Sequence, residues 1–461
     1  MNVFLIVLLV VIPVLFIFFS FLFVVFFSSP VDRFQAVLPK IIVILGMALA
    51  GCAVLFLPFD VWNNSQGGGL TNATPIIWQI VFAVIAAFIV IIVPFSMLYF
   101  EAYDSDKPPV KNVLCQTLCA SIGTVIIFLI VGAASHYKLS MSTARLAIQN
   151  AGTLLTRMGI VVYITAFLCF FGWLVFVICG GCGMSAIPIS LILACIKKPK
   201  RIKMDEFVMQ QKKFAVRANN LIEAGKKVED LRRQPGGRTN LKTVRLYQDF
   251  KRAVYQCEEE YLIVKTQFEK GGGSIFLYGG ALILGILAII VTILWIVHII
   301  VFMLTPVPLW GGLNYLFYYL DLGFPLFGLI AYSIFAFYLL MAIIAGNITI
   351  ASRLPFISLY PIKFKDTLTS SFLYNTGLLL FGSIAVIQFT ANAFSRYARF
   401  TSLNGFFNVY VSNMIYIRYY FMYVHYAFFG FIFIGFVLSM IFAFIPNKTK
   451  EQKMIEQIMA S

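Results

Sequence analysis

The sequence predicts an all-α, polytopic helical membrane protein with about nine transmembrane spans and a cytoplasmic antiparallel helical hairpin. Of the 461 residues, 61% are hydrophobic and only 12% are charged, and the mean hydropathy is +0.91. Long apolar runs recur along the chain, and one charged segment interrupts them. A soluble protein has no way to bury so much apolar surface, whereas lipid accepts it.

Each span needs about 20 apolar residues at a rise of about 1.5 Å per residue. The first run has no basic leader and no cleavage site after it, so we expect a retained span and not a signal peptide. A tenth apolar piece, 184–196, is too short to cross. We expect it to be a kinked continuation of the span before it or a segment buried against other helices. The nine predicted spans are 3–27, 41–59, 76–99, 113–134, 159–179, 275–304, 325–344, 372–390 and 426–445.

The charged segment predicts a helical hairpin. Apolar residues recur at steps of three and four along 204–232 and again along 240–270, which is typical of amphipathic helices. Pro235-Gly236-Gly237 breaks the chain between them, and three glycines at 271–273 form a flexible joint. The predicted domains are therefore an N-terminal membrane region of five spans and the kinked piece, a basic cytoplasmic hairpin, a C-terminal membrane region of four spans and a cytoplasmic tail. Their bounds are 1–196, 197–274, 275–445 and 446–461.

Positive charge predicts the orientation. With the N-terminus lumenal or extracellular and the C-terminus cytosolic, 29 of the 35 Lys and Arg residues fall on the cytoplasmic side. A cluster at 197–203 either fixes this topology alone or also binds anionic lipid. The net charge of +16 comes without a nucleic-acid-binding motif, so nucleic acid is not an expected partner.

Glycosylation triplets agree with this orientation. Those at Asn63 and Asn72 fall in a predicted lumenal loop and are candidate glycosylation sites, whereas those at Asn347 and Asn447 fall on the cytoplasmic side. None of the eight cysteines falls in a predicted lumenal loop, so no disulfide framework is expected.

The sequence contains no metal-site spacing, catalytic triad, phosphate loop or carboxylate pair. We therefore expect neither an enzyme nor a bound cofactor or metal. Cys179-Gly180-Gly181-Cys182 lies at membrane depth, where small residues favour close helix contact; palmitoylation is the alternative.

Breaks and polar residues within the spans are the candidate functional features. Polar groups are costly in lipid, so these residues either bond between helices or line a ligand path. The glycines and proline after residue 179 predict either a hinge in that path or plain tight packing. At span ends, Asp60 and Glu101 are either solvated carboxylates or gating contacts. The candidates for the path or hinge are Gly180, Gly181, Gly183, Ser185, Pro188, His298, Asn375, Gln388 and Asn392.

Several motifs together resemble one family over nearly the whole chain. Leu57-Pro58-Phe59-Asp60-Val61 is followed by Val93-Pro94-Phe95, then by Gly183-Met184-Ser185-Ala186-Ile187-Pro188 and a basic hairpin. Trp295-Ile296-Val297-His298 and Ser370-Ser371-Phe372-Leu373-Tyr374-Asn375 follow later. This order resembles the limb-region (LMBR-type) membrane proteins, a family that includes the lipocalin-interacting membrane receptor and the lysosomal cobalamin exporter.

The resemblance implies nine spans, a lumenal N-terminus and a role in uptake or export at endolysosomal or plasma membranes. It favours a transporter or receptor-like protein for a small ligand such as cobalamin. The alternative is a non-transporting adaptor in trafficking or signalling, whose hairpin recruits partners. Expected partners are the lipid bilayer, anionic lipid at 197–203, a cytosolic protein at the hairpin and a second copy of the chain.

Overall fold

The computed structural model describes most of the chain. The described residues are 3–28, 37–65, 73–103, 138–141, 154–157, 160–196, 202–233, 241–269, 275–305, 310–324, 326–353, 367–413 and 417–444, with a few isolated positions. The chain divides into two units, 1–187 with 289–439 and 188–288 with 440–461, called here the membrane bundle and the hairpin unit. This division falls within helices, whereas the sequence placed the domain boundaries in loops.

Eight helical segments in the described part of the chain are long and apolar enough to cross a membrane. They coincide with eight of the nine predicted spans, which confirms a polytopic helical membrane protein. The predicted span 113–134 lies outside the described residues except for isolated positions. The eight are Val10–Phe27, Val37–Asn64, Thr74–Tyr99, Val161–Ile196, Phe276–Met303, Phe327–Ile350, Thr369–Ala393 and Arg418–Ile441.

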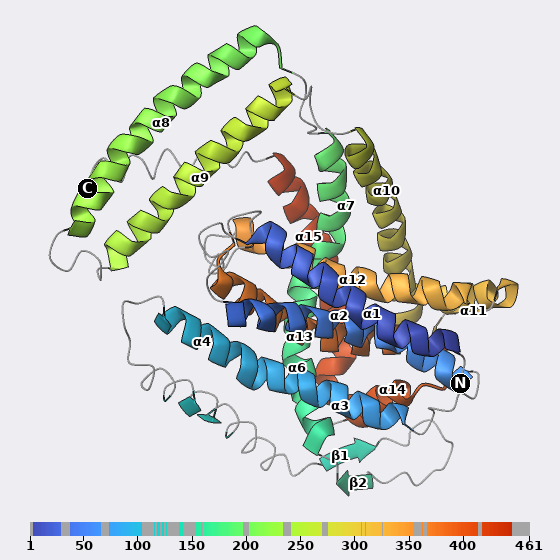
Figure 1. The fold of residues 1–461 in the computed structure, drawn as a ribbon. Helices are drawn as coiled ribbons and strands as arrows, with labels where there is room; N and C mark the ends of the chain where they lie inside the picture. Colours follow the sequence, from blue (N-terminus) through green and yellow to red (C-terminus); the bar gives the residue numbers. More distant parts are fainter. Residues whose placement is uncertain are drawn as a thin grey trace. The chain divides into compact units, whose positions relative to one another are not determined.

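Helix α13 (Thr369–Ala393) forms the core of the membrane bundle. It packs against α2 (Val37–Ser65), α6 (Ile160–Val175) and α12 (Phe327–Arg353), as Figure 1 shows. Its side chains are the most completely buried of the eight spans, which is why it tolerates more polar residues than the others. Helices α1 (Val3–Phe27), α10 (Ile275–His298) and α15 (Arg418–Phe444) expose many large apolar side chains, as lipid-facing helices do.

Several spans contain a π-helical turn. One, Phe88–Ile92, joins α3 (Thr74–Ala87) to α4 (Val93–Tyr103), and the next joins α6 to α7 (Gly181–Ile196). A π-turn holds one residue more than an α-turn and commonly marks functional or strained positions. The first precedes Pro94, which has no N–H to continue the ladder. The second is Phe176–Gly180, and the predicted piece 184–196 continues the preceding span through it. Of the two predicted alternatives, the structure therefore shows the continuation.

Two elements add to the expected all-α pattern. Strands β1 (Lys138–Met141) and β2 (Leu154–Arg157) form a small antiparallel pair between the predicted spans 113–134 and 159–179. Helix α11 (Leu313–Gly323) lies between α10 and α12 and packs on α12. It buries Leu313, Asn314 and Phe317 and exposes aromatic residues.

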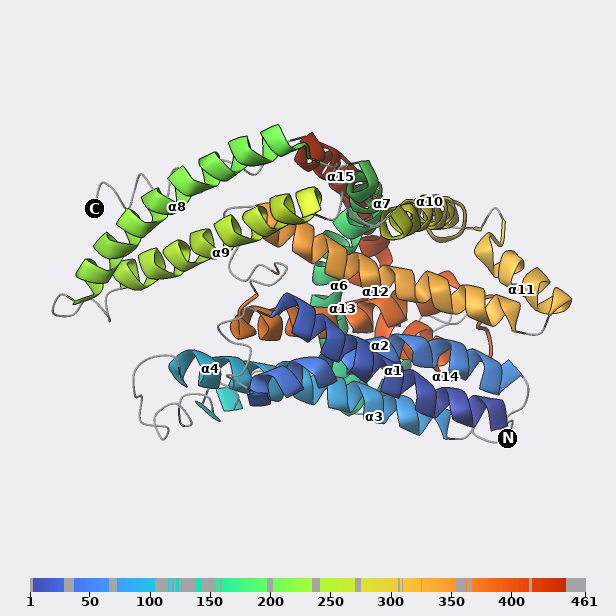
Figure 2. The same ribbon diagram turned by 45° about the horizontal axis from the view of Figure 1, so that its top comes forward.

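The hairpin unit contains α8 (Met204–Arg233) and α9 (Leu241–Glu269), which pack together as predicted (Figure 2). The rings of Phe207 and Phe268 stack with centroids 4.4 Å apart, and Arg217 pairs with Glu260 at 2.6 Å. The two contacts join the start of α8 to the end of α9, so the helices are antiparallel. The predicted turn at Pro235 lies outside the described residues.

Candidate functional site

Two helices touch backbone to backbone where the sequence predicted a hinge or tight packing. A methyl group on Gly183 of α7 would overlap the Ala342 carbonyl of α12, and one on Gly346 of α12 would overlap the Cys179 carbonyl. Only glycine leaves room for so close an approach. The contact therefore supports tight packing.

The same segment also meets α15. A methyl group on Gly435 would overlap the Cys182 backbone, and one on Gly181 would crowd Phe431. Gly180 lies against the ring of a phenylalanine in its own helix. Cys179 and Cys182 are both buried, which leaves their thiols little access for palmitoylation. The glycines thus join three helices.

Pro188 frees the Met184 carbonyl, because a proline has no N–H for the residue four positions earlier. The Thr292 hydroxyl donates to this carbonyl at 3.1 Å. The Tyr338 hydroxyl lies 2.6 Å from the Thr292 oxygen and 3.3 Å from the carbonyl, so its one hydrogen is shared between these two acceptors. The Ser185 hydroxyl donates to a carbonyl in its own helix. Helices α10 and α12 therefore cap the carbonyl that Pro188 leaves without a partner in its own helix.

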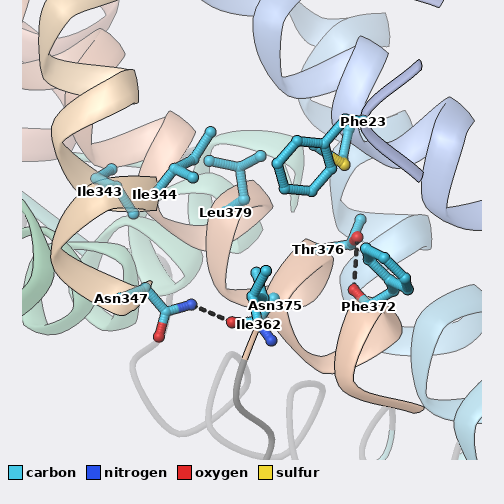
Figure 3. A pocket seen from close by; sticks show the side chains of 10 residues that line it. Phe23, Ile343, Ile344, Asn347, Ile362, Phe372, Asn375, Thr376 and Leu379 are labelled. Carbon is cyan, nitrogen blue, oxygen red and sulfur yellow. Dashed lines mark hydrogen bonds between the residues drawn. The ribbon is translucent and has the colours of Figure 1, made fainter. Parts of the chain in front are cut away.

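Asn375 lies at the start of α13 and bonds to α12. The Asn347 amide donates to the Asn375 side-chain oxygen, and the Asn375 amide donates to the Ser371 carbonyl at 2.6 Å. Figure 3 shows the two amides turned toward each other beside Leu379 and Phe372. The cavity that they line measures about 20 Å³, room for about one water molecule. Asn375 therefore bonds between helices.

Gln388 receives two bonds from α6. Its side-chain oxygen accepts from the Trp173 indole N–H at 2.7 Å and from the Cys169 thiol at 2.7 Å. Both partners are donors, so the oxygen must face them and the Gln388 amide nitrogen must face away. That nitrogen is buried and has no hydrogen-bond partner among the described residues, and the same holds for His425 Nε2. The His425 ring packs on Trp173 with centroids 5.0 Å apart.

His298 fastens α11 to α13. The Leu313 N–H donates to His298 Nδ1 at 3.2 Å, so Nε2 carries the hydrogen and donates to the Ala393 carbonyl at 2.9 Å. Asn314 donates to the same carbonyl at 3.1 Å. Gly312 has a φ of 55°, and a methyl group there would overlap the His298 ring. Both ring nitrogens are occupied, so His298 is a structural residue here and does not line an open path.

A second set of bonds holds the other end of α11. The Tyr397 hydroxyl donates to Asp321 at 2.6 Å, and the Gly328 N–H donates to the other oxygen of this carboxylate at 2.8 Å. The Tyr397 N–H donates to the Asn314 side chain at 3.0 Å. Burial, together with the hydrogen bond to Asp321, raises the pKa of Tyr397.

Asp60 is fully buried, so the expectation of a solvated carboxylate is wrong. Its oxygens accept from Asn64 at 2.6 Å, from the Trp78 indole at 3.1 Å and from the Ser402 hydroxyl at 3.2 Å. The Leu403 N–H also binds it. A buried carboxylate needs such partners, and Asp60 thereby links α2, α3 and the segment after α13.

The other predicted site residues are placed as follows. Asn63 is 2% exposed within α2, a burial that does not fit glycosylation, and Asn72 lies outside the described residues. The Asn392 side-chain oxygen is buried without a hydrogen-bond partner in the described part of the chain. Glu101 lies in α4, and its side chain is not among those described.

The membrane bundle contains a large apolar cavity that no sequence motif predicts. Helices α1, α2, α3 and α12 enclose about 480 Å³. The wall includes Pro13 and Pro58, which lie inside α1 and α2, and Phe56, whose ring packs on Trp78 with centroids 4.9 Å apart. Ser333 is the one polar lining residue, and its hydroxyl bonds to its own helix. The lining residues are Ile12, Pro13, Leu49, Cys52, Ala53, Leu55, Phe56, Pro58, Phe59, Ile77, Val81, Leu326, Leu329, Ile330 and Ser333.

Comparisons with known proteins agree with the architecture. The family described as LMBR1-like membrane protein matches residues 2–250. A LIMR family protein of Dictyostelium discoideum is 29% identical over 97% of this chain and 98% of its own length. LIMR family proteins of Oryza sativa subsp. japonica and Arabidopsis thaliana are 28% and 30% identical over 92% and 86% of this chain, and over 92% and 87% of their own lengths. No solved structure matches. The chain therefore belongs to the LMBR1-like family of membrane proteins.

Proposed function

We propose that this protein is a multi-pass membrane transporter or receptor-like protein that binds an apolar or amphipathic small molecule within the bilayer. The cavity between α1, α2, α3 and α12 carries this proposal. Its volume of about 480 Å³ lies in the range of small-molecule sites, roughly 300–1,000 Å³. Proline in two of its walls gives those helices places to bend when a ligand enters.

The lining selects the class of ligand. Fourteen of the fifteen lining residues are apolar, so the cavity has almost no partner for a polar group. A corrinoid such as cobalamin carries many amide groups that would lose their hydrogen bonds to water there. A hydrocarbon chain or a flat apolar ring system has no such cost. The cavity therefore favours a lipid-like ligand over cobalamin.

The proposed orientation follows from charge. The excess of Lys and Arg in the segments assigned to the cytoplasm supports a lumenal or extracellular N-terminus. The proposed location, an endolysosomal or plasma membrane, rests on the family resemblance alone. A thiol introduced at Val216 of α8, which is 62% exposed, reports on this orientation. In cells with the protein at the plasma membrane, an impermeant maleimide should label Val216→Cys only after permeabilisation. Labelling in intact cells would reverse the orientation.

Cavity-filling variants test the ligand site. The protein is reconstituted in liposomes with a photoactivatable fatty acid, and crosslinked peptides are mapped by mass spectrometry. We expect crosslinks in the 49–59 segment of α2. Cys52→Phe and Ser333→Phe fill the cavity and should reduce these crosslinks several-fold. Leu45→Phe is the matched control, because Leu45 lies on the same helix, is 43% exposed and does not line the cavity.

The outcomes separate the two functions. Loss of crosslinks in both cavity variants, with the control unchanged and all three proteins monodisperse, supports the ligand site. Equal crosslinking in all variants would contradict it. The better account would then be the non-transporting adaptor, in which the hairpin recruits cytosolic partners.

A further inference from the structure

The hairpin unit carries an apolar groove between its two helices. The groove has a volume of about 630 Å³, and apart from Gln211, Glu258 and the hydroxyl of Tyr261 its lining is apolar. Phe214, Phe250 and Ile222 are among the lining residues, and Ile222 is 58% exposed. This hairpin is the most charged part of the chain, so such a groove would face water unless a partner covers it.

The sequence after α15 has the pattern of a partner helix. Residues 445–461 lie outside the described residues, but their sequence places Met454, Ile455, Ile458 and Met459 at steps that form one face of a helix. Lys453 comes directly before this face, and Glu258 lines the groove, so opposite charges can meet beside the apolar contact. A helix face of this kind fits a hydrophobic groove.

Topology places the two segments on the same side of the membrane. Four described spans separate the hairpin from residue 445, and an even number of crossings returns the chain to the side it left. The tail is therefore tethered near the groove, at an effective concentration of about 1 mM for a short flexible link. A second copy of the chain or a free cytosolic protein has no such advantage.

We propose that residues 453–460 bind as an amphipathic helix in the groove between α8 and α9, so that this chain covers its own hairpin. The proposal is independent of the membrane cavity. Ile222→Cys provides the measurement, because Ile222 lines the groove, is 58% exposed and lies outside the membrane spans. A bound tail shields the thiol at this position from a water-soluble maleimide, and a released tail exposes it.

The test uses the full-length protein in open membranes. Ile455→Asp and Ile458→Asp place a charge on the apolar face of the tail. Ala460→Asp adds the same charge on the opposite face and is the matched control. All variants carry Ile222→Cys. With a Kd of about 0.1 mM for the tethered segment, the groove is covered roughly nine-tenths of the time, so release should raise the labelling rate at residue 222 about tenfold. A protein that retains Ile222 gives the background from other thiols.

Two results would overturn the proposal. One is equal labelling at residue 222 in proteins with the wild-type tail, Ile455→Asp and Ala460→Asp, as expected if the tail lies on the lipid surface instead. The other comes from oxidising a protein with both Ile222→Cys and Ile458→Cys, which should form a disulfide between these positions within one chain. A covalent dimer in place of that intrachain bond would assign the groove to a second copy.

Discussion

Substituting Gly183 by alanine measures how much the contact between α7 and α12 contributes to stability. The new methyl group would overlap the Ala342 carbonyl, which belongs to a helix backbone and has no rotamer to move into. The helices must separate, and overpacking of this kind costs about 2–3 kcal/mol. Alanine regains about 1 kcal/mol of helix propensity over glycine. We expect a net loss of about 1–2 kcal/mol.

Thermal unfolding in detergent, followed by size-exclusion chromatography, measures this loss. The matched control is Gly430→Ala on α15, because a methyl group at Gly430 would meet no atom within 4 Å. We expect the Gly183→Ala protein to melt several degrees below wild type, and the control to melt at or above it. Equal melting temperatures for the two variants would refute close backbone packing at Gly183 and restore the hinge.

Two more predictions concern hydrogen bonds. Thr292→Val removes one donor to the carbonyl that Pro188 frees and should cost about 0.5–1 kcal/mol, whereas Thr292→Ser keeps the hydroxyl and should melt like wild type; equal melting of the two variants would contradict the capping role. The raised pKa of Tyr397 means that the folded protein keeps its phenolic proton when the unfolded chain loses it near pH 10. Stability should therefore be constant below about pH 10 and fall above it, and Tyr397→Phe should flatten this fall in melting curves from pH 8 to 11; an unchanged slope would contradict burial of this hydroxyl.

Hydropathy and charge periodicity predicted the membrane spans and the hairpin because both signals are local. The length of an apolar run is enough to identify a span, and the spacing of apolar residues is enough to identify an amphipathic helix. Helix α11 was not predicted, because its 11 residues are too few for a span and its aromatic residues raise the hydropathy only weakly. The predicted spans end at residue 304 and begin again at residue 325, which leaves this region as a loop between them. Helix α11 is held in place by tertiary contacts with His298 and Tyr397, which a local sequence pattern does not reveal.

The candidate site shows the same limit. The sequence identified Gly183 and Pro188 as unusual for a helix, since glycine and proline have known backbone properties. It had no means of naming Gly346 or Thr292 as their partners, which lie more than 100 residues away in the chain. Asp60 was expected at a span end, and its burial depends on Ser402, 342 residues later. Which residues pair across such distances in the chain is decided by how the helices pack, and a local sequence pattern does not contain that information.

The π-turn at Phe176–Gly180 gives one span two independent orientations. Its additional residue rotates everything after it by about 100° relative to an unbroken α-helix. Before the turn, Trp173 donates a hydrogen bond to Gln388 of α13. After the turn, Gly183 packs against the Ala342 backbone of α12. Deleting a single residue from the turn would therefore rotate α7 relative to α6. Gly183 would then no longer face α12, and the other contacts of α7 would be displaced with it.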